Sequence, residues 1–204
     1  MSQSFHSIRT LGVLLFPEFE TLDVFGPLEV FGMLPDKIKI MMLAEEHGLV
    51  KSAQGQSIWA DCSCIDAPKL DILLVPGGIG TRREVNNPAL IHWIKDRTAH
   101  AELTLSVCTG AALLARAGVL QGRKATTNKL AFNWVVEQDP TVDWIKKARW
   151  VDDGSIVTSS GISAGIDMSL YIVSRLFGSS LRDELAKKAE YIVNTDSSFD
   201  PFML

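Results

Sequence analysis

The segment that decides the fold is LTLSVCTGAALLARAG, residues 103–118. Residues 103–107 are predicted to form a buried strand. From Cys108 onward, small and apolar residues continue to Gly118, a residue type that commonly ends helices. The segment therefore predicts a strand that turns directly into a helix, with Cys108 at the junction.

The rest of the chain continues this alternation of apolar strands and helices. Strands are expected at 8–16, 38–43, 71–75 and 124–126, and a two-stranded hairpin at 148–151 and 155–158. Helices are expected from residue 22, with a kink or restart at Gly26-Pro27, and at 88–101, 130–137, 161–177 and 181–193. Residues 49–59 predict a hairpin or an irregular excursion, where we expect no chemistry. This order predicts an α/β flavodoxin-like sandwich, a mostly parallel sheet with helices on both faces and ligands at the carboxyl ends of the strands.

Length and composition favour one domain, residues 1–204, because 47% of the residues are hydrophobic and 22% are charged. The net charge of -4 supplies no basic field for a nucleic acid. No apolar stretch approaches the roughly 18 residues that cross a bilayer. Three cysteines do not make a secreted disulfide framework or a zinc site. We expect a cytoplasmic protein with no metal, no organic cofactor, no nucleic-acid partner and no membrane contact.

Cys108 has two physical reasons to be reactive. Amides at the amino terminus of a helix favour a thiolate, and a tight turn exposes the side chain. Small residues at 110–112 allow close packing, as in the nucleophile elbow of hydrolases. The amide after Cys108, with those of Gly77 and Gly78 in the loop after another strand, is suited to bind a developing anion. Taken alone, Cys108 is equally well explained as a small buried apolar residue.

The acid-base partner is expected to be a carboxylate. All four histidines precede Cys108, and His92 and His100 fall on the helix before its strand, so a cysteine–histidine triad is disfavoured. Asp23 follows the first strand among apolar residues, where desolvation raises the pKa of a carboxyl group toward neutrality. Local sequence alone favours the alternative, in which Asp23 caps the helix that begins there. For Asp167, within an apolar helical run, a structural role behind Cys108 is favoured.

Several motifs follow one another along the chain: LFPE (15–18), LDVFGP (22–27), VPGG (75–78), SVCTG (106–110), ATT (125–127) and GISAGID (161–167). Together they look like the ThiJ/PfpI superfamily of class I glutamine amidotransferase-like proteins. Within the superfamily, the Cys-Thr-Gly elbow with an early Leu-Asp and Gly-Pro resembles the isocyanide hydratase branch. The resemblance implies a cysteine nucleophile at Cys108, an acid-base residue at Asp23 and an anion pocket lined by Thr109 and Gly78. It also implies a small-molecule substrate and a homodimer.

Two features separate this chain from other members. The protease-like branch has histidine directly after the cysteine, where this chain has Thr109, so a peptidase is not expected. After Ala-Thr-Thr, the hydratase branch usually has histidine and tryptophan, where this chain has Asn128 and Lys129. The same core also serves as the sensory half of AraC-type regulators, but this chain stops at Leu204, so a DNA-binding regulator is not expected. A non-enzymatic ligand-binding or redox-sensing module, using a low-pKa Cys108, stays the alternative.

Overall fold

A seven-stranded sheet forms the centre of the computed structural model, which describes residues 8–203. Its order is β10-β11-β7-β6-β1-β2-β5, and every neighbouring pair is parallel except β10 with β11. The strands are β1 (Arg9–Leu14), β2 (Ile38–Ala44), β5 (Cys62–Ser63), β6 (Ile72–Val75), β7 (Leu103–Ser106), β10 (Trp150–Asp153) and β11 (Ile156–Ser159). Every residue of β6, β7 and β11 is buried, as is typical of strands in a parallel sheet that is covered on both faces.

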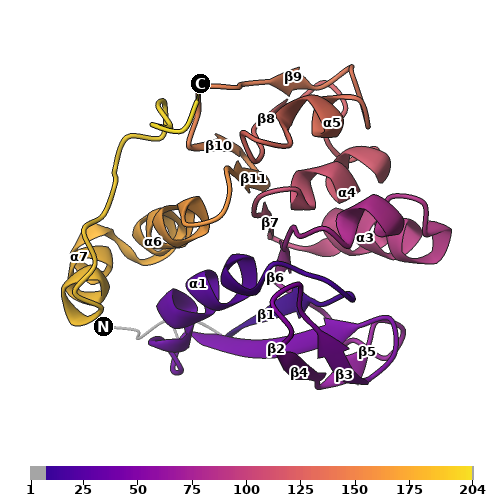
Figure 1. Ribbon diagram of the computed structural model, residues 1–204. Coiled ribbons are helices and arrows are strands. Elements are labelled where there is room, and N and C mark those ends of the chain that lie inside the picture. The colour runs from indigo at the N-terminus through magenta and orange to yellow at the C-terminus, as the bar shows by residue number, and fades with distance from the viewer. Residues whose placement is uncertain (1–7, 204) are drawn as a thin grey trace.

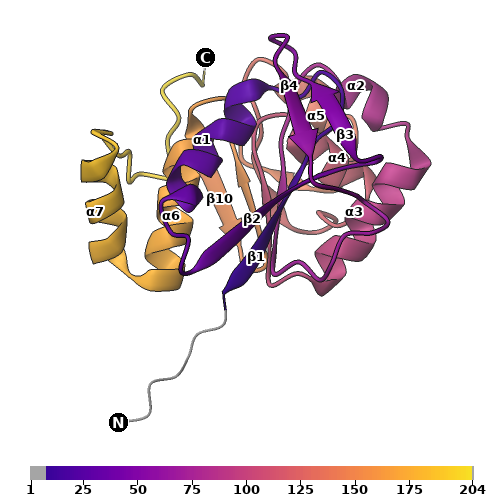
Figure 2. The same ribbon diagram turned by 90° about the horizontal axis from the view of Figure 1, so that it is seen from below.

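Helices cover both faces of this sheet (Figures 1 and 2). One layer contains α1 (Thr21–Gly32), α6 (Ala164–Phe177) and α7 (Ser179–Lys188). The other contains α2 (Thr81–Glu84), α3 (Pro88–His100), α4 (Gly110–Arg116) and α5 (Phe132–Val136). The predicted α/β sandwich with a mostly parallel sheet is therefore confirmed.

Two small ribbons lie outside the main sheet. The antiparallel hairpin of β3 (Gly48–Lys51) and β4 (Ser57–Ala60) falls where a hairpin was one of two expectations. The second ribbon pairs β8 (Lys124–Ala125) with β9 (Asp143–Trp144) in parallel. The sequence did not indicate β5, β9 or α2, because elements of two to four residues are too short to show a period.

Two helices differ from expectation. Helix α1 runs as one element through Pro27 and does not restart. Helix α7 was expected to reach residue 193 but ends at Lys188. The chain then turns through Glu190, whose φ is 50°, and the Tyr191 amide donates to the Ala186 carbonyl. This turn brings the Tyr191 hydroxyl to the carboxylate of Asp167, 3.1 Å away, a tertiary contact that local periodicity does not report.

The strand order places the candidate site. From β1 the chain crosses to β2 on one side, whereas β6 lies on the other side of β1, so the direction of winding reverses between β1 and β6. Crevices outside the carboxyl ends of strands at such a reversal are the usual ligand sites of open α/β sheets. Asp23, Gly77 and Cys108 follow β1, β6 and β7 at this edge. Within the described residues, no helix has the length and apolarity needed to span a membrane.

Candidate active site

Cys108 lies at a strained turn between β7 and α4. Its φ is 57°, a conformation that side chains rarely adopt and that clusters at functional sites. The turn is held because the Cys108 amide donates to the Ser160 carbonyl at 3.2 Å and the Cys108 carbonyl accepts from the Thr127 hydroxyl at 2.7 Å. A side chain at Gly110 would collide with the Val75 carbonyl oxygen, so a residue without Cβ is needed there. The predicted elbow is therefore present.

Asp23 is fully buried in the first turn of α1. It does not cap that helix, which begins after Glu20 and has no side-chain cap. Instead its Oδ2 accepts the Gly77 amide at 2.9 Å, and its Oδ1 has no hydrogen-bond partner among residues 8–203. Burial raises the pKa of Asp23 well above its ordinary value, and the Gly77 amide and the Cys108 side chain partly oppose this shift.

The pKa of the Cys108 thiol is raised as well. Its side chain is 6% exposed, and burial is the largest cause, followed by the negative charge of Asp23. The Thr109 amide and hydroxyl lower the pKa, but they do not outweigh burial. The expectation of a low-pKa cysteine is therefore wrong for this structure, in which Cys108 and Asp23 form a buried thiol–carboxyl pair.

The glycine loop after β6 contacts the elbow but leaves few free donors. The Gly77 amide is occupied by Asp23, and the Gly78 amide donates to the Thr109 hydroxyl oxygen at 3.1 Å. The Thr81 hydroxyl completes this buried network, 3.1 Å from the Thr109 hydroxyl. Gly77, Gly78 and Thr109 thus lie together beside Cys108, as the sequence predicted, but the two glycine amides hold the site together instead of facing a ligand.

An open pocket of about 280 Å³ leads to Cys108. Its lining residues are Glu20, Gly78, Ile79, Arg82, Cys108, Thr109, Asn128, Leu130, Ala131 and Ile162. No histidine lines it, and His92 and His100 lie exposed on α3; His6 lies outside the described residues. Among residues 8–203 no three His, Cys, Asp or Glu side chains gather in a way that could hold a metal ion.

Asn128, at the position where the hydratase branch is expected to have histidine, lines the same pocket as Cys108. Its Oδ1 accepts the Ala131 amide at 2.9 Å, which orients the Nδ2 group. A Cβ at Gly161 would collide with that Nδ2 and lie 2.9 Å from Cys108 Sγ, so both side chains meet at the Gly161 backbone. Lys129 points away, because its Nζ donates to the Ala148 carbonyl at 2.6 Å, and burial lowers the pKa of Lys129 to about 8.

Glu20 is a pocket residue that the sequence did not reveal. Gln54, in the turn of the β3–β4 hairpin, donates to Glu20 Oε1 at 2.8 Å and accepts the Thr21 amide at 3.0 Å. The hairpin also binds the backbone before α1, where the Ala53 amide donates to the Phe19 carbonyl at 2.8 Å. A segment where no chemistry was expected therefore positions one wall of the site.

Asp167 has the structural role that was favoured for it. Its Oδ2 lies 2.7 Å from Nε and 2.6 Å from Nη2 of Arg149, and its Oδ1 accepts the Tyr191 hydroxyl and the Asn194 amide. The Arg149 carbonyl in turn accepts the Ser160 amide, next to the contact that holds Cys108. This buried ion pair supports the loop behind the nucleophile.

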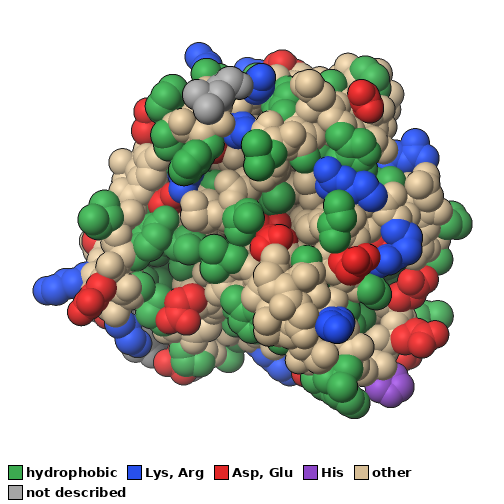
Figure 3. All heavy atoms as spheres, in the orientation of Figure 1, with side chains coloured by type: hydrophobic (Ala, Val, Ile, Leu, Met, Phe, Trp, Pro, Cys, Tyr) green, Lys and Arg blue, Asp and Glu red, His purple; other side chains and the backbone are tan. Residues whose placement is uncertain are grey.

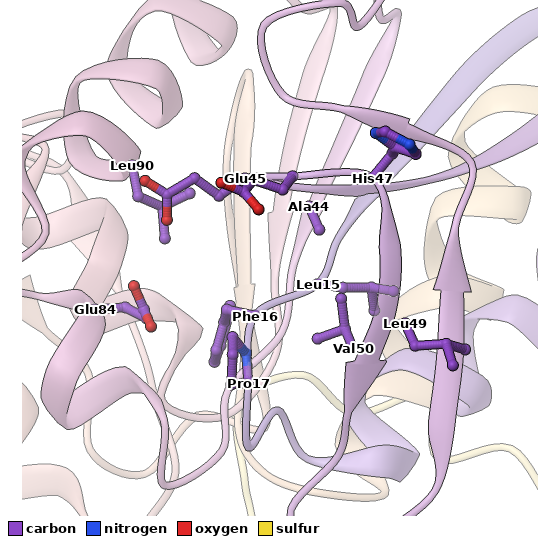
Figure 4. Close-up of a pocket in the computed structure, with 11 residues that line it drawn as sticks. Leu15, Phe16, Pro17, Ala44, Glu45, His47, Leu49, Val50, Glu84 and Leu90 are labelled. Carbon is purple, nitrogen blue, oxygen red and sulfur yellow. The ribbon is translucent and has the colours of Figure 1, made fainter.

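A second, larger pocket of about 350 Å³ lies between the ends of β1 and β2, the β3–β4 hairpin and α2. Figure 4 shows the Glu45 and Glu84 side chains on one side of it and His47 on the other. The side-chain Nδ2 of Asn87 donates to Glu45 Oε2 and to Glu84 Oε2, each at 3.0 Å. Neither Cys108 nor Asp23 reaches this pocket, so the smaller one is the candidate active site.

Comparisons with known proteins agree with this geometry. The model of the DJ-1/PfpI family matches residues 9–175. The chain belongs to the DJ-1/PfpI family. It is 35% identical to an isonitrile (isocyanide) hydratase of Pseudomonas putida over 182 residues, which cover 89% of this chain and 78% of the hydratase. The resemblance to the ThiJ/PfpI superfamily and to its hydratase branch is thereby confirmed.

Other members of the DJ-1/PfpI family have different named roles. The chain is 28% identical to the transcriptional regulator CdhR of Pseudomonas aeruginosa over 86% of its length, but spans only 53% of that regulator. A crystal structure of a ThiJ/PfpI family protein from Pseudomonas syringae superposes with a TM-score of 0.85 at 28% identity, covering 97% of this chain and 79% of that one. Family membership therefore establishes the fold and a hydratase-like relative, and the chemical roles of Cys108, Asp23, Gly77, Gly78 and Thr109 stay predictions.

Proposed function

We propose that the protein is a cofactor-independent, isocyanide hydratase-like lyase in which Cys108 is the nucleophile and Asp23 moves the proton. The observation that carries the proposal is the buried pair itself, since Asp23 and Cys108 both have raised pKa values and one oxygen of Asp23 has no hydrogen-bond partner in the described part of the chain. The similarity to the isonitrile hydratase supports the substrate class.

The chemistry of an isocyanide fits a thiol beside a carboxyl group. The terminal carbon accepts a nucleophile and also takes up a proton, so its first step is the net addition of S–H to one atom. A free thiolate without a nearby acid would supply the sulfur nucleophile but not the proton. A neutral, desolvated thiol whose proton passes through Asp23 supplies both parts, which reconciles the raised pKa of Cys108 with a nucleophilic role.

The steps balance without an external oxidant or reductant. Cys108 Sγ bonds to the isocyanide carbon, and the thiol proton reaches that carbon through Asp23, giving a thioimidate. Water then adds to the same carbon, which gains a hydroxyl group, and the one proton that the water releases passes through Asp23 to the nitrogen. The C–S bond breaks as the hydroxyl group loses its proton, which returns to sulfur through Asp23, and an N-substituted formamide leaves.

Asn128 Nδ2 and the Thr109 amide are the proposed donors to charge that develops during these steps. The amides of Gly77 and Gly78 already donate to Asp23 and Thr109, whereas Asn128 Nδ2 lies beside Gly161 next to Cys108 Sγ. Loss of one such donor typically lowers the rate about 10²- to 10³-fold. Asn128→Ala should therefore reduce kcat, and Asn128→His should restore part of it.

The test is formamide production from simple alkyl and aryl isocyanides by wild type, Cys108→Ala and Asp23→Asn. Turnover is expected in the wild type and should be lost in both variants. The matched control is Cys64→Ala, which removes another buried cysteine whose pKa burial raises to about 12 but which does not line the pocket. Wild type without turnover on any isocyanide, while Cys108 forms sulfenic or sulfinic acid with peroxide, would instead support the redox-sensing alternative.

A further inference from the structure

Arg82 is a half-buried cation in the mouth of the Cys108 pocket. It follows Thr81 in α2, and its only side-chain hydrogen bond within the described chain is from Nη1 to the Thr81 hydroxyl at 3.3 Å. It forms no ion pair among residues 8–203. Its neighbour Arg83, by contrast, pairs with Glu18 and Glu84 and lies outside the pocket.

Trp134 holds the Arg82 guanidinium in place. The Arg82 Cζ lies 3.9 Å from the centre of the Trp134 ring, a close cation–π contact. A guanidinium that stacks by its face keeps its N–H donors at its edge, where they can bind a planar carboxylate in a bidentate manner. The stack also restricts the side chain in advance, so less conformational entropy is lost when a ligand binds.

The rest of the pocket mouth is largely apolar. Ile79, Leu130 and Ile162 are 57%, 101% and 38% exposed. Glu20 is the acidic residue of the lining, and Gln54 and the hairpin turn hold it. The pocket therefore combines an apolar wall with one acidic group that already has a donor and one guanidinium that has no acidic partner in the described chain.

We propose that Arg82 determines specificity by binding a carboxylate on the substrate, so that the site prefers a small isocyanide that carries a carboxylate. The reaction type rests on the proposed function, but the preference for an anion at Arg82 does not. A pocket of about 280 Å³ is compatible with a ligand of this size.

The first experiment requires no turnover. Alkylation of Cys108 by neutral iodoacetamide is followed by peptide mass spectrometry in the presence of N-formylglycine or N-formyl-β-alanine, each compared with its carboxamide. In the wild type, the acids should protect Cys108 at about tenfold lower concentration than the amides, as one charge-assisted contact would produce. Arg82→Gln should remove this difference.

Three variants sharpen the result. Arg83→Gln removes the same charge outside the pocket and should keep the preference for the acids. Glu20→Gln removes the negative charge that opposes binding of the acids and should increase the preference for them. Trp134→Leu should weaken it, because the guanidinium loses its support. Equal protection by acid and amide in the wild type, or an unchanged acid preference in Arg82→Gln, would overturn the proposal.

The second experiment separates this inference from the proposed function. If isocyanides are hydrated, Arg82→Gln should raise the ratio of KM for 3-isocyanopropanoate to KM for its methyl ester about tenfold. Acid preference without hydration would refute the hydratase and keep the role of Arg82. Hydration with equal KM for acid and ester would support the hydratase and refute the role of Arg82.

Discussion

The buried pair of Arg149 and Asp167 gives the sharpest test of how the fold supports the nucleophile. The two side chains are 7% and 1% exposed. Asp167→Ala leaves the Arg149 charge buried with only Asp200, 3.9 Å from Nη1, to compensate it. Removing one partner of a buried pair typically destabilises by about 3–5 kcal/mol, and the remaining acid places this variant near the lower end, about 3 kcal/mol.

Urea and thermal unfolding measure this effect directly. For a chain of this length, about 3 kcal/mol corresponds to a fall in Tm of about 6–12 °C. The control is Glu102→Gln, which breaks the exposed pair with Arg9, where the side chains are 21% and 47% exposed, and should change stability by less than about 1 kcal/mol.

The double variant decides whether the loss comes from an unpaired buried charge. Arg149→Met and Asp167→Leu should each destabilise by about 3 kcal/mol, whereas the double variant should lose clearly less than their sum of about 6 kcal/mol. Strict additivity, or a loss in Asp167→Ala no larger than in Glu102→Gln, would refute the reasoning. Because the Arg149 carbonyl accepts the Ser160 amide, the single variants should also change the alkylation rate of Cys108.

Three further predictions concern Asp23, Gly110 and Phe25. Because burial raises the pKa of Asp23, wild-type stability should fall as pH rises from its ordinary value of 3.8 through the raised one; Asp23→Asn should melt higher at neutral pH, and equally near pH 3. Gly110→Ala should destabilise by about 1–3 kcal/mol through its collision with Val75, whereas Gly32→Ala, which has room, should not. Figure 3 shows apolar side chains over α1 and α6, and Phe25 on α1 is 38% exposed; if this face joins two copies in the proposed homodimer, Phe25→Glu should sediment as a monomer.

The parts of the fold that the sequence predicted are those with a strong local signal. Apolar runs marked β1 and β6, and Asn87-Pro88 marked the start of α3, where the Asn87 side chain accepts the Leu90 amide. Local signals failed for α7, whose end is set by the contact of Tyr191 with Asp167, 24 residues apart in the chain. They also failed for Gln54, whose relevance to the site depends on a hairpin turn packing against the residues before α1.

The candidate site shows the same division between local and tertiary causes. Cys108 and Asp23 were identified because each follows a strand that ends at the same edge of the sheet. Arg82 and Glu20 were not, since a charged residue near a glycine loop or a strand end usually faces solvent. The packing of α5 against α4, which brings Trp134 to Arg82, and the ion pairs of Arg83 with Glu18 and Glu84 distinguish the two neighbouring arginines.

The protonation of Cys108 is the clearest case in which a local argument gave the wrong sign. An oriented helix terminus stabilises a charge by about 0.3–1 kcal/mol, and up to about 2 kcal/mol when partly buried. Moving an ionised group out of water without a positive partner opposes this by several kcal/mol. A second acid, Asp23, adds repulsion, and Thr109 supplies only neutral donors to the sulfur. Burial therefore decides the direction in which the pKa of Cys108 shifts. A site that keeps its proton is suited to a reaction that adds both sulfur and hydrogen to one carbon.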